Sequence, residues 1–136
     1  NYLKAINYYT ELIKIDEEDF YAYYNRGWNK AHLGKYGEAL KDFEQSIELN
    51  PNFTMAYINR GSMNYFLGNY SDSITDYNKA IKLDKNNLSV FYNRALSKIK
   101  LGESTDSICS DLERSKSINP LEINELINTY CDKTYV

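Results

Sequence analysis

The chain has 136 residues, of which 43% are apolar, and a formal net charge of -3 with a pI near 5.2. This length and composition suit one domain with its own hydrophobic core. The acidic balance, with no basic stripe, argues against a nucleic-acid partner. No apolar run approaches the roughly 18 residues of a membrane helix, so no membrane partner is expected either. The compartment stays open, with the cytoplasm favoured.

A sequence motif recurs at a spacing of 34 residues. The segment that begins at Tyr23 (YYNRGWNKAHLGKY) returns at Tyr57 (YINRGSMNYFLGNY) and, more loosely, at Phe91 (FYNRALSKIKLGES). A fixed period of this size indicates stacked copies of one supersecondary unit. We therefore expect an array whose function is to present a surface.

Residues 1–19 match only the second half of this unit. Tyr2, Ala5 and Tyr9 lie 34 residues before Tyr36, Ala39 and Phe43, which are of the same kind. We expect residues 1–19 to hold the second helix of a truncated repeat, so that the chain would be a piece of a longer protein. Its apolar stripe should then be partly exposed and could support a weak homodimer. The stripe consists of Tyr2, Ile6, Tyr9 and Ile13.

The three complete units are residues 20–53, 54–87 and 88–120, and each is expected to be a pair of antiparallel helices. A glycine ends the first helix of each pair, where positive φ is favourable: Gly34, Gly68 and Gly102. A small residue in each first helix would let the second helix approach closely: Gly27, Gly61 and Ala95. The third unit has one extra residue, which we place in the segment GESTDS after Gly102.

An arginine column and an aspartate column run through the three units. The arginines, on the first helices, are Arg26, Arg60 and Arg94, and the aspartates, on the second helices, are Asp42, Asp76 and Asp111. A row of arginines could capture an anion. We favour ion pairs within each helix pair, because every arginine has its own repeating carboxylate.

Residues 121–136 are expected to form a capping helix and a tail. Asn119 and Pro120 make a good helix start, and an apolar stripe beside Glu122 would cover the last repeat. The two cysteines, Cys109 and Cys131, are too few for a disulfide scaffold. We expect reduced thiols, because Cys109 falls in an apolar helix stripe; one disulfide is the alternative.

These columns of aromatic, small, Gly, Ala and Pro residues resemble the tetratricopeptide repeat (TPR) family over nearly the whole chain, and "NRG" at Asn25 and Asn59 resembles a common Asn-Arg-Gly subtype. The resemblance implies an all-α, right-handed superhelix of antiparallel helix pairs, here a single domain. Some positions depart from the pattern. Lys85 stands where Pro is usual and Ser73 where Ala is usual, and a column that is often aromatic holds Lys30, Asn64 and Lys98.

The residues give no sign of catalysis. His32 is the only histidine and has no Ser, Cys or Asp column that would meet it, and the three His and Cys residues are too far apart in sequence for a zinc site. The glycines are periodic and do not form a phosphate-binding loop. We therefore interpret the chain as non-enzymatic, without a metal or cofactor.

In such an array the first helices line the concave side, and the face turned away from the core is available to a partner. Ten residues on these faces are the candidate peptide-binding site: Tyr24, Asn25, Trp28, Ile58, Asn59, Ser62, Tyr65, Tyr92, Asn93 and Leu96. Asn25, Asn59 and Asn93 form a column whose carboxamides could bond a peptide backbone. Peptide-binding TPR proteins are known for such a ladder; capping or bridging of helices is the equally weighted alternative.

The aromatic residues of this set, with Trp28 first, would supply apolar contact, although Tyr65 could equally belong to the core. The Hsp90/Hsp70 type of TPR clamps a C-terminal carboxylate with basic residues, and here only Asn59 fits that row. The expected function is therefore a protein–protein interaction module that binds an extended peptide or partner segment. The alternative is a structural spacer or self-association element of a larger protein.

Overall fold

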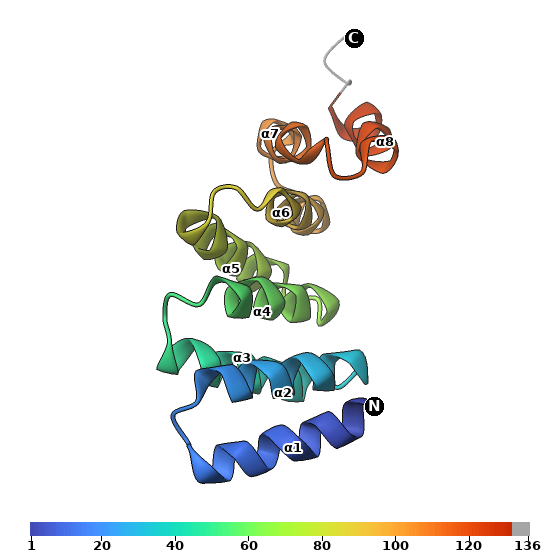
Figure 1. The fold of residues 1–136 in the computed structure, drawn as a ribbon. Coiled ribbons are helices and arrows are strands. Elements are labelled where there is room, and N and C mark those ends of the chain that lie inside the picture. Colours follow the sequence, from blue (N-terminus) through green and yellow to red (C-terminus); the bar gives the residue numbers. More distant parts are fainter. Residues whose placement is uncertain (132–136) are drawn as a thin grey trace. The chain divides into compact units, whose positions relative to one another are not determined.

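The computed structural model describes residues 1–131 and contains eight α-helices there, the number expected (Figure 1). In chain order they are α1 Tyr2–Ile15, α2 Phe20–His32, α3 Tyr36–Leu49, α4 Thr54–Phe66, α5 Tyr70–Leu83, α6 Leu88–Leu101, α7 Thr105–Ser115 and α8 Pro120–Tyr130. Contacts divide the chain into two compact units, Asn1–Asn69 (unit 1) and Tyr70–Val136 (unit 2). Residues 132–136 of the expected tail lie outside the described part.

The turns inside the helix pairs are built as the glycine column predicts. Gly34, Gly68 and Gly102 have φ of +73°, +82° and +77°, a conformation that L-residues with a side chain rarely adopt. The next helix starts two residues after Gly34 and Gly68 but three after Gly102. The extra residue of the third unit therefore lies in this turn, as expected.

The connections between successive pairs also repeat. A side-chain carboxylate or carboxamide at Asp16, Asn50 and Asp84 accepts a hydrogen bond from the backbone N–H two residues later, at 2.9, 3.2 and 3.0 Å. These three residues are 34 apart and follow the ends of α1, α3 and α5. Such Asx turns stop one helix and redirect the chain into the next.

Unit 1 has a core made by α2, α3 and α4. Its buried side chains are Tyr24, Ala39, Phe43, Ala56 and Met63. Gly27 allows the close approach that its column predicts: a Cβ there would lie 3.0 Å from Asp42 Cβ and 3.0 Å from a ring carbon of Phe43. The apolar stripe of α1 was expected to be partly exposed. This expectation is wrong at Ile13, which is buried.

The core of unit 2 is formed by Ala95, Ile108, Leu112 and Ile123, from α6, α7 and α8. Ser73, which departs from the usual alanine, is fully buried and lies 2.9 Å from the hydroxyl of Ser97. The polar substitution is tolerated because the two buried hydroxyls satisfy each other.

Ion pairs join α2 to α3 and α6 to α7, as expected. Arg26 donates to both oxygens of Asp42, at 2.9 and 2.7 Å, and Arg94 makes the same fork to Asp111, at 2.8 and 2.6 Å. Hydrogen bonding to Asp42 raises the pKa of Arg26, while burial opposes it. The predicted pair of Arg60 and Asp76 has its members in different units and stays a prediction.

A second cation at each aspartate was not anticipated from the sequence. Lys30 Nζ lies 2.9 Å from Asp42, and Lys98 Nζ lies 2.7 Å from Asp111. These lysines stand in the column that is often aromatic in similar repeats. Each lysine comes four residues after its arginine and therefore lies on the same helix face. This spacing could have predicted that both cations pair with one aspartate.

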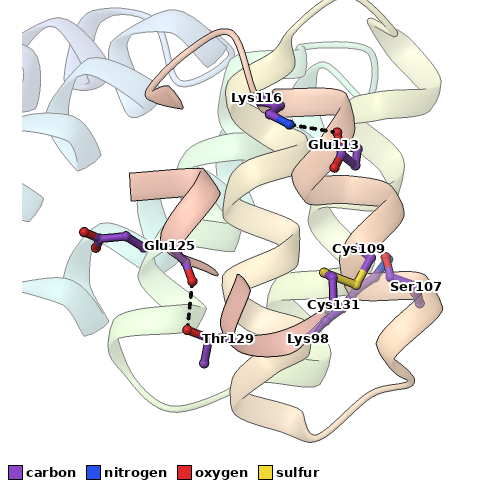
Figure 2. The surroundings of a disulfide bond; sticks show 8 residues. All are labelled: Lys98, Ser107, Cys109, Glu113, Lys116, Glu125, Thr129 and Cys131. Carbon is purple, nitrogen blue, oxygen red and sulfur yellow. Dashed lines mark hydrogen bonds and ion pairs between the residues drawn. A yellow bond between two sulfur atoms is a disulfide. The ribbon is translucent and has the colours of Figure 1, made fainter. Parts of the chain in front are cut away.

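The expectation of reduced cysteines was wrong. Cys109 of α7 and Cys131, the residue after α8, form a disulfide with a Cα–Cα distance of 5.8 Å (Figure 2). Cys109 does lie in a helix, as the stripe indicated. The packing of α8 on α7 brings Cys131 close to Cys109. The separation of 22 residues in the sequence does not predict this proximity.

Candidate peptide-binding surface

The candidate site residues lie on the first helices, with those of α2 and α4 in unit 1 and those of α6 in unit 2. The periodic pattern places them there because the opposite face of each helix carries the core residues.

Tyr24 differs from its expected place on the open surface. It is only 9% exposed and belongs to the unit 1 core, with its ring against Phe53 (4.9 Å between centroids) and Phe43 (5.9 Å). Burial raises the pKa of its hydroxyl, and the hydrogen bond from Asn59 acts in the opposite direction. Tyr24 therefore belongs to the core beneath the candidate surface, and its hydroxyl holds Asn59 in place.

Asn25 and Asn59 are each held by one hydrogen bond. Asn25 Nδ2 donates to the backbone carbonyl of Tyr21 at 2.8 Å, and Asn59 Nδ2 donates to the Tyr24 hydroxyl at 3.0 Å. Both side chains are half-buried. Their carboxamide oxygens accept no hydrogen bond within residues 1–131. Capping or bridging of helices therefore uses one N–H of each carboxamide and leaves the carboxamide oxygen without a donor in the described part of the chain.

Trp28 is an exposed aromatic residue of α2, with 40% of its surface accessible. Its ring lies 3.8 Å from that of His32 and 6.2 Å from that of Tyr2, which stacks on His32 at 5.0 Å. Tyr2 thus ties α1 to the end of α2. Tyr36 makes the equivalent stack on Phe66 at 5.3 Å, so this contact between successive helices is itself periodic.

The remaining candidates of unit 1 lie on α4. Ile58 and Ser62 are half-buried, and the Ser62 hydroxyl donates to the Ile58 carbonyl at 3.1 Å. Tyr65 is half-buried with its ring edge-on to Phe66 at 5.8 Å. Two other side chains are more exposed to solvent than Ile58, Ser62 and Tyr65. They are Tyr21 at the start of α2 and Met55 at the start of α4.

In unit 2 the three candidates have different surroundings. Tyr92 packs against α8 beside the core, and its hydroxyl donates to the Glu122 carboxylate. Leu96 is half-buried. Asn93 is half-buried too, and its carboxamide makes no hydrogen bond to any part of the chain that the structure describes.

Within residues 1–131 no three His, Cys, Asp or Glu side chains gather as they would around a metal ion. No described helix is long and apolar enough to cross a membrane. The geometry is that of hydrogen-bond acceptors and aromatic rings held on a helical framework.

Two models of tetratricopeptide repeats match the sequence, one over residues 20–53 and one over residues 61–102, together more than half of the chain. The chain belongs to the tetratricopeptide repeat family. The helix pairs and the positive-φ glycines described above are those of TPR repeats. No curated protein matches the chain by sequence.

Solved TPR structures share the fold at low identity. MamA (41-end) from Desulfovibrio magneticus RS-1 aligns with a TM-score of 0.81 at 19% identity, over 88% of this chain and 67% of the solved chain. The first TPR of Spaghetti (RPAP3), bound to the HSP90 peptide SRMEEVD, aligns with 0.73 at 20%, over 85% and 94%. YrrB, described as a TPR protein with an unusual peptide-binding site, aligns with 0.75 at 21%, over 82% and 57%. At these identities the likeness establishes the fold alone.

Proposed function

We propose that the first helices of this TPR array bind an extended peptide or a partner segment in a concave groove. The observation that carries the proposal is the state of Asn25 and Asn59. One N–H of each carboxamide is engaged by the protein, which fixes the side chain and leaves its oxygen as a prepared acceptor. Such an acceptor suits the backbone N–H of a peptide, whatever the peptide's side chains.

Exposed aromatic surface adds the second half of the argument. Trp28 and Tyr21 are exposed on α2. Aromatic side chains contribute large contact areas at a small cost in conformational entropy, and they dominate binding hot spots. In this proposal Asn25, Asn59 and Asn93 hold the peptide backbone, and the aromatic rings contact its side chains. Tyr24 contributes by orienting Asn59.

The two peptide-bound or peptide-binding neighbours support the class of partner but not its sequence. The neighbour in complex with SRMEEVD holds an acidic peptide, whereas the candidate surface here carries few cations. Lys30 and Lys98 are committed to Asp42 and Asp111. We therefore expect a ligand recognised through its backbone and apolar side chains.

The test is a random-peptide selection on the wild-type chain and on the triple variant Asn25→Ala, Asn59→Ala, Asn93→Ala, after equal melting has been shown. A matched control replaces Asn7, Asn124 and Asn128, which are exposed helical asparagines outside the site. We expect peptides to be enriched on the wild type and the control and lost on the site variant. Equal enrichment on all three chains, or none on any, would contradict the proposal.

A second candidate function is self-association through α1. Tyr8 and Ile15 are 60% and 84% exposed on this helix. Tyr8 occupies the column that elsewhere holds Asp42, Asp76 and Asp111, so the corresponding face of α1 is apolar where the others are charged. Light scattering over a dilution series decides this: a mass that rises with concentration, and falls to that of a monomer in Tyr8→Asp, would favour self-association. A constant monomer removes it.

A further inference from the structure

Helix α8 occupies in unit 2 the place that α4 occupies in unit 1. In unit 1, Ala56 and Met63 of α4 cover Ala39 and Phe43 of α3. In unit 2, Ile123 of α8 covers the residues of α7 in the same two columns. These are Ile108 and Leu112. The face beneath α8 is therefore a stacking face, shaped for the first helix of a following repeat.

The noncovalent contacts of α8 are one apolar stripe and a hydrogen bond from Tyr92 to Glu122. Ile123 is its one buried residue, while Leu126, Ile127 and Tyr130 are partly buried against the cluster. These four residues follow the spacing i, i+3, i+4 and i+7 of a single apolar stripe. An isolated helix of 11 residues is marginal in water, so α8 depends on this contact for its own structure.

The disulfide supplies what the packing lacks. The chain connects the start of α8 to α7, and the bond from Cys131 to Cys109 attaches its far end to the same helix (Figure 2). Both cysteines are only half-buried, so a reductant can reach them. The bond closes a loop of 22 residues that contains the whole of α8.

We propose that this disulfide is a redox-controlled lock on α8, and that its reduction opens the stacking face of α6 and α7 to an amphipathic helix from a partner. A dithiol supplies two electrons and two protons: the S–S bond breaks, both cysteines become thiols, and the dithiol becomes a disulfide. The partner helix is defined by what α8 itself presents, an apolar stripe at i, i+3, i+4 and i+7. This surface adjoins the peptide-site face of α6, because Tyr92 of the candidate site packs beside the same cluster and donates to Glu122 of α8.

The experiment uses a fluorescent peptide with the sequence of residues 119–131, in which the cysteine is replaced by serine. It is titrated into the full chain oxidised, reduced with dithiothreitol, and as the double variant Cys109→Ser, Cys131→Ser. We expect the reduced chain and the double variant to bind the peptide at least about tenfold more tightly than the oxidised chain, because the constraint on α8 is gone. Reductant should leave the double variant unchanged. Equal binding to the oxidised and reduced chains, or no binding to the reduced chain, would overturn the proposal.

Hydrogen exchange on the same samples separates a local lock from a general loss of structure. Reduction should speed exchange in residues 120–130 by about tenfold or more and leave α2 and α3 unchanged. Unchanged exchange in α8 would mean that the disulfide does not hold this helix. Faster exchange throughout both units would mean that it maintains the whole fold, and either result would exclude the lock.

Discussion

At the scale of single residues, two glycines of neighbouring helices have opposite roles. Gly27 lies where a Cβ would come within 3.0 Å of Asp42 Cβ and of the Phe43 ring, and within 3.2 Å of the Ala39 carbonyl oxygen. Gly37, in the first turn of α3, has nothing within 4 Å of that position. The same chemical change is therefore expected to have opposite effects at the two sites.

We expect Gly27→Ala to lower the free energy of unfolding by about 1–3 kcal/mol, because backbone and ring atoms must move to admit the methyl group. Gly37→Ala should raise it by about 0.5–1 kcal/mol through the lower conformational entropy of the unfolded chain. Urea unfolding of both variants measures the difference. Equal effects of the same sign would show that the close approach of α2 and α3 is not the cause.

Asp42 has a larger role than the paired columns suggested. Its carboxylate is almost fully buried and forms ion pairs with both Arg26 and Lys30, whose side chains are 17% and 14% exposed. Removing the charge leaves the partly buried Arg26 without its carboxylate partner, and leaves Lys30 with only Glu38, whose carboxylate lies 4.0 Å away. A single substitution here affects two ion pairs at once.

For Asp42→Asn we expect a loss of about 3 kcal/mol in the free energy of unfolding, as for other buried ion pairs that lose one partner. Glu44→Gln is the matched control, since Glu44 is an exposed acid of the same helix, and its effect should stay within about 0.5 kcal/mol. Chemical denaturation of the three chains is the measurement. A loss below about 1 kcal/mol for Asp42→Asn would mean that water compensates the cations.

At the scale of elements, α8 has one fully buried side chain in its apolar stripe. Ile123 is fully buried, while Leu121, two residues earlier, is 76% exposed. Replacing Ile123 by alanine should weaken the packing of α8 by about 2–4 kcal/mol, the usual cost of deleting a buried branched side chain.

Hydrogen exchange in residues 120–130 reports this change directly, with Leu121→Ala as the control. We expect faster exchange in Ile123→Ala and unchanged exchange in Leu121→Ala. Because the disulfide still holds the far end of α8 in both variants, the effect of Ile123→Ala should increase when the chain is reduced. An effect that is the same in both redox states would show that packing and disulfide act independently.

At the scale of the whole molecule, each unit has a hydrophobic cluster of its own. Phe43 and Leu112 occupy the same column of the repeat. Both are fully buried, each in the cluster of its own unit. In repeat proteins stability is close to a sum of local terms. A cavity made in one cluster should therefore lower the local stability of the unit that contains it more than that of the other unit.

We expect Phe43→Ala, at about 3–5 kcal/mol, to reduce protection from hydrogen exchange more in α2 and α3 than in α6 and α7. Leu112→Ala, at about 2–5 kcal/mol, should show the reverse order. Site-resolved exchange on both variants makes the comparison. An identical, uniform loss in the two variants would indicate that the chain unfolds as one cooperative body.

The sequence by itself determined the helical pairs, their turns and the pairing of Arg26 with Asp42 and of Arg94 with Asp111. A period of 34 residues repeats every local constraint, so that glycine conformation, helix amphipathicity and charge pairing all indicate the same hairpin. The likeness to TPR proteins rests on these same columns.

Only the tertiary structure decided where individual side chains on the first helices lie. Tyr24 is next to Asn25 in sequence, and helical spacing alone could not tell that its ring enters the core and its hydroxyl meets Asn59, because that depends on how closely α2 and α4 pack. The disulfide of Cys109 and Cys131 likewise follows from the packing of α8 against α7. Periodicity specifies the face of a helix on which a residue lies, whereas the distance between two faces is set by packing in three dimensions.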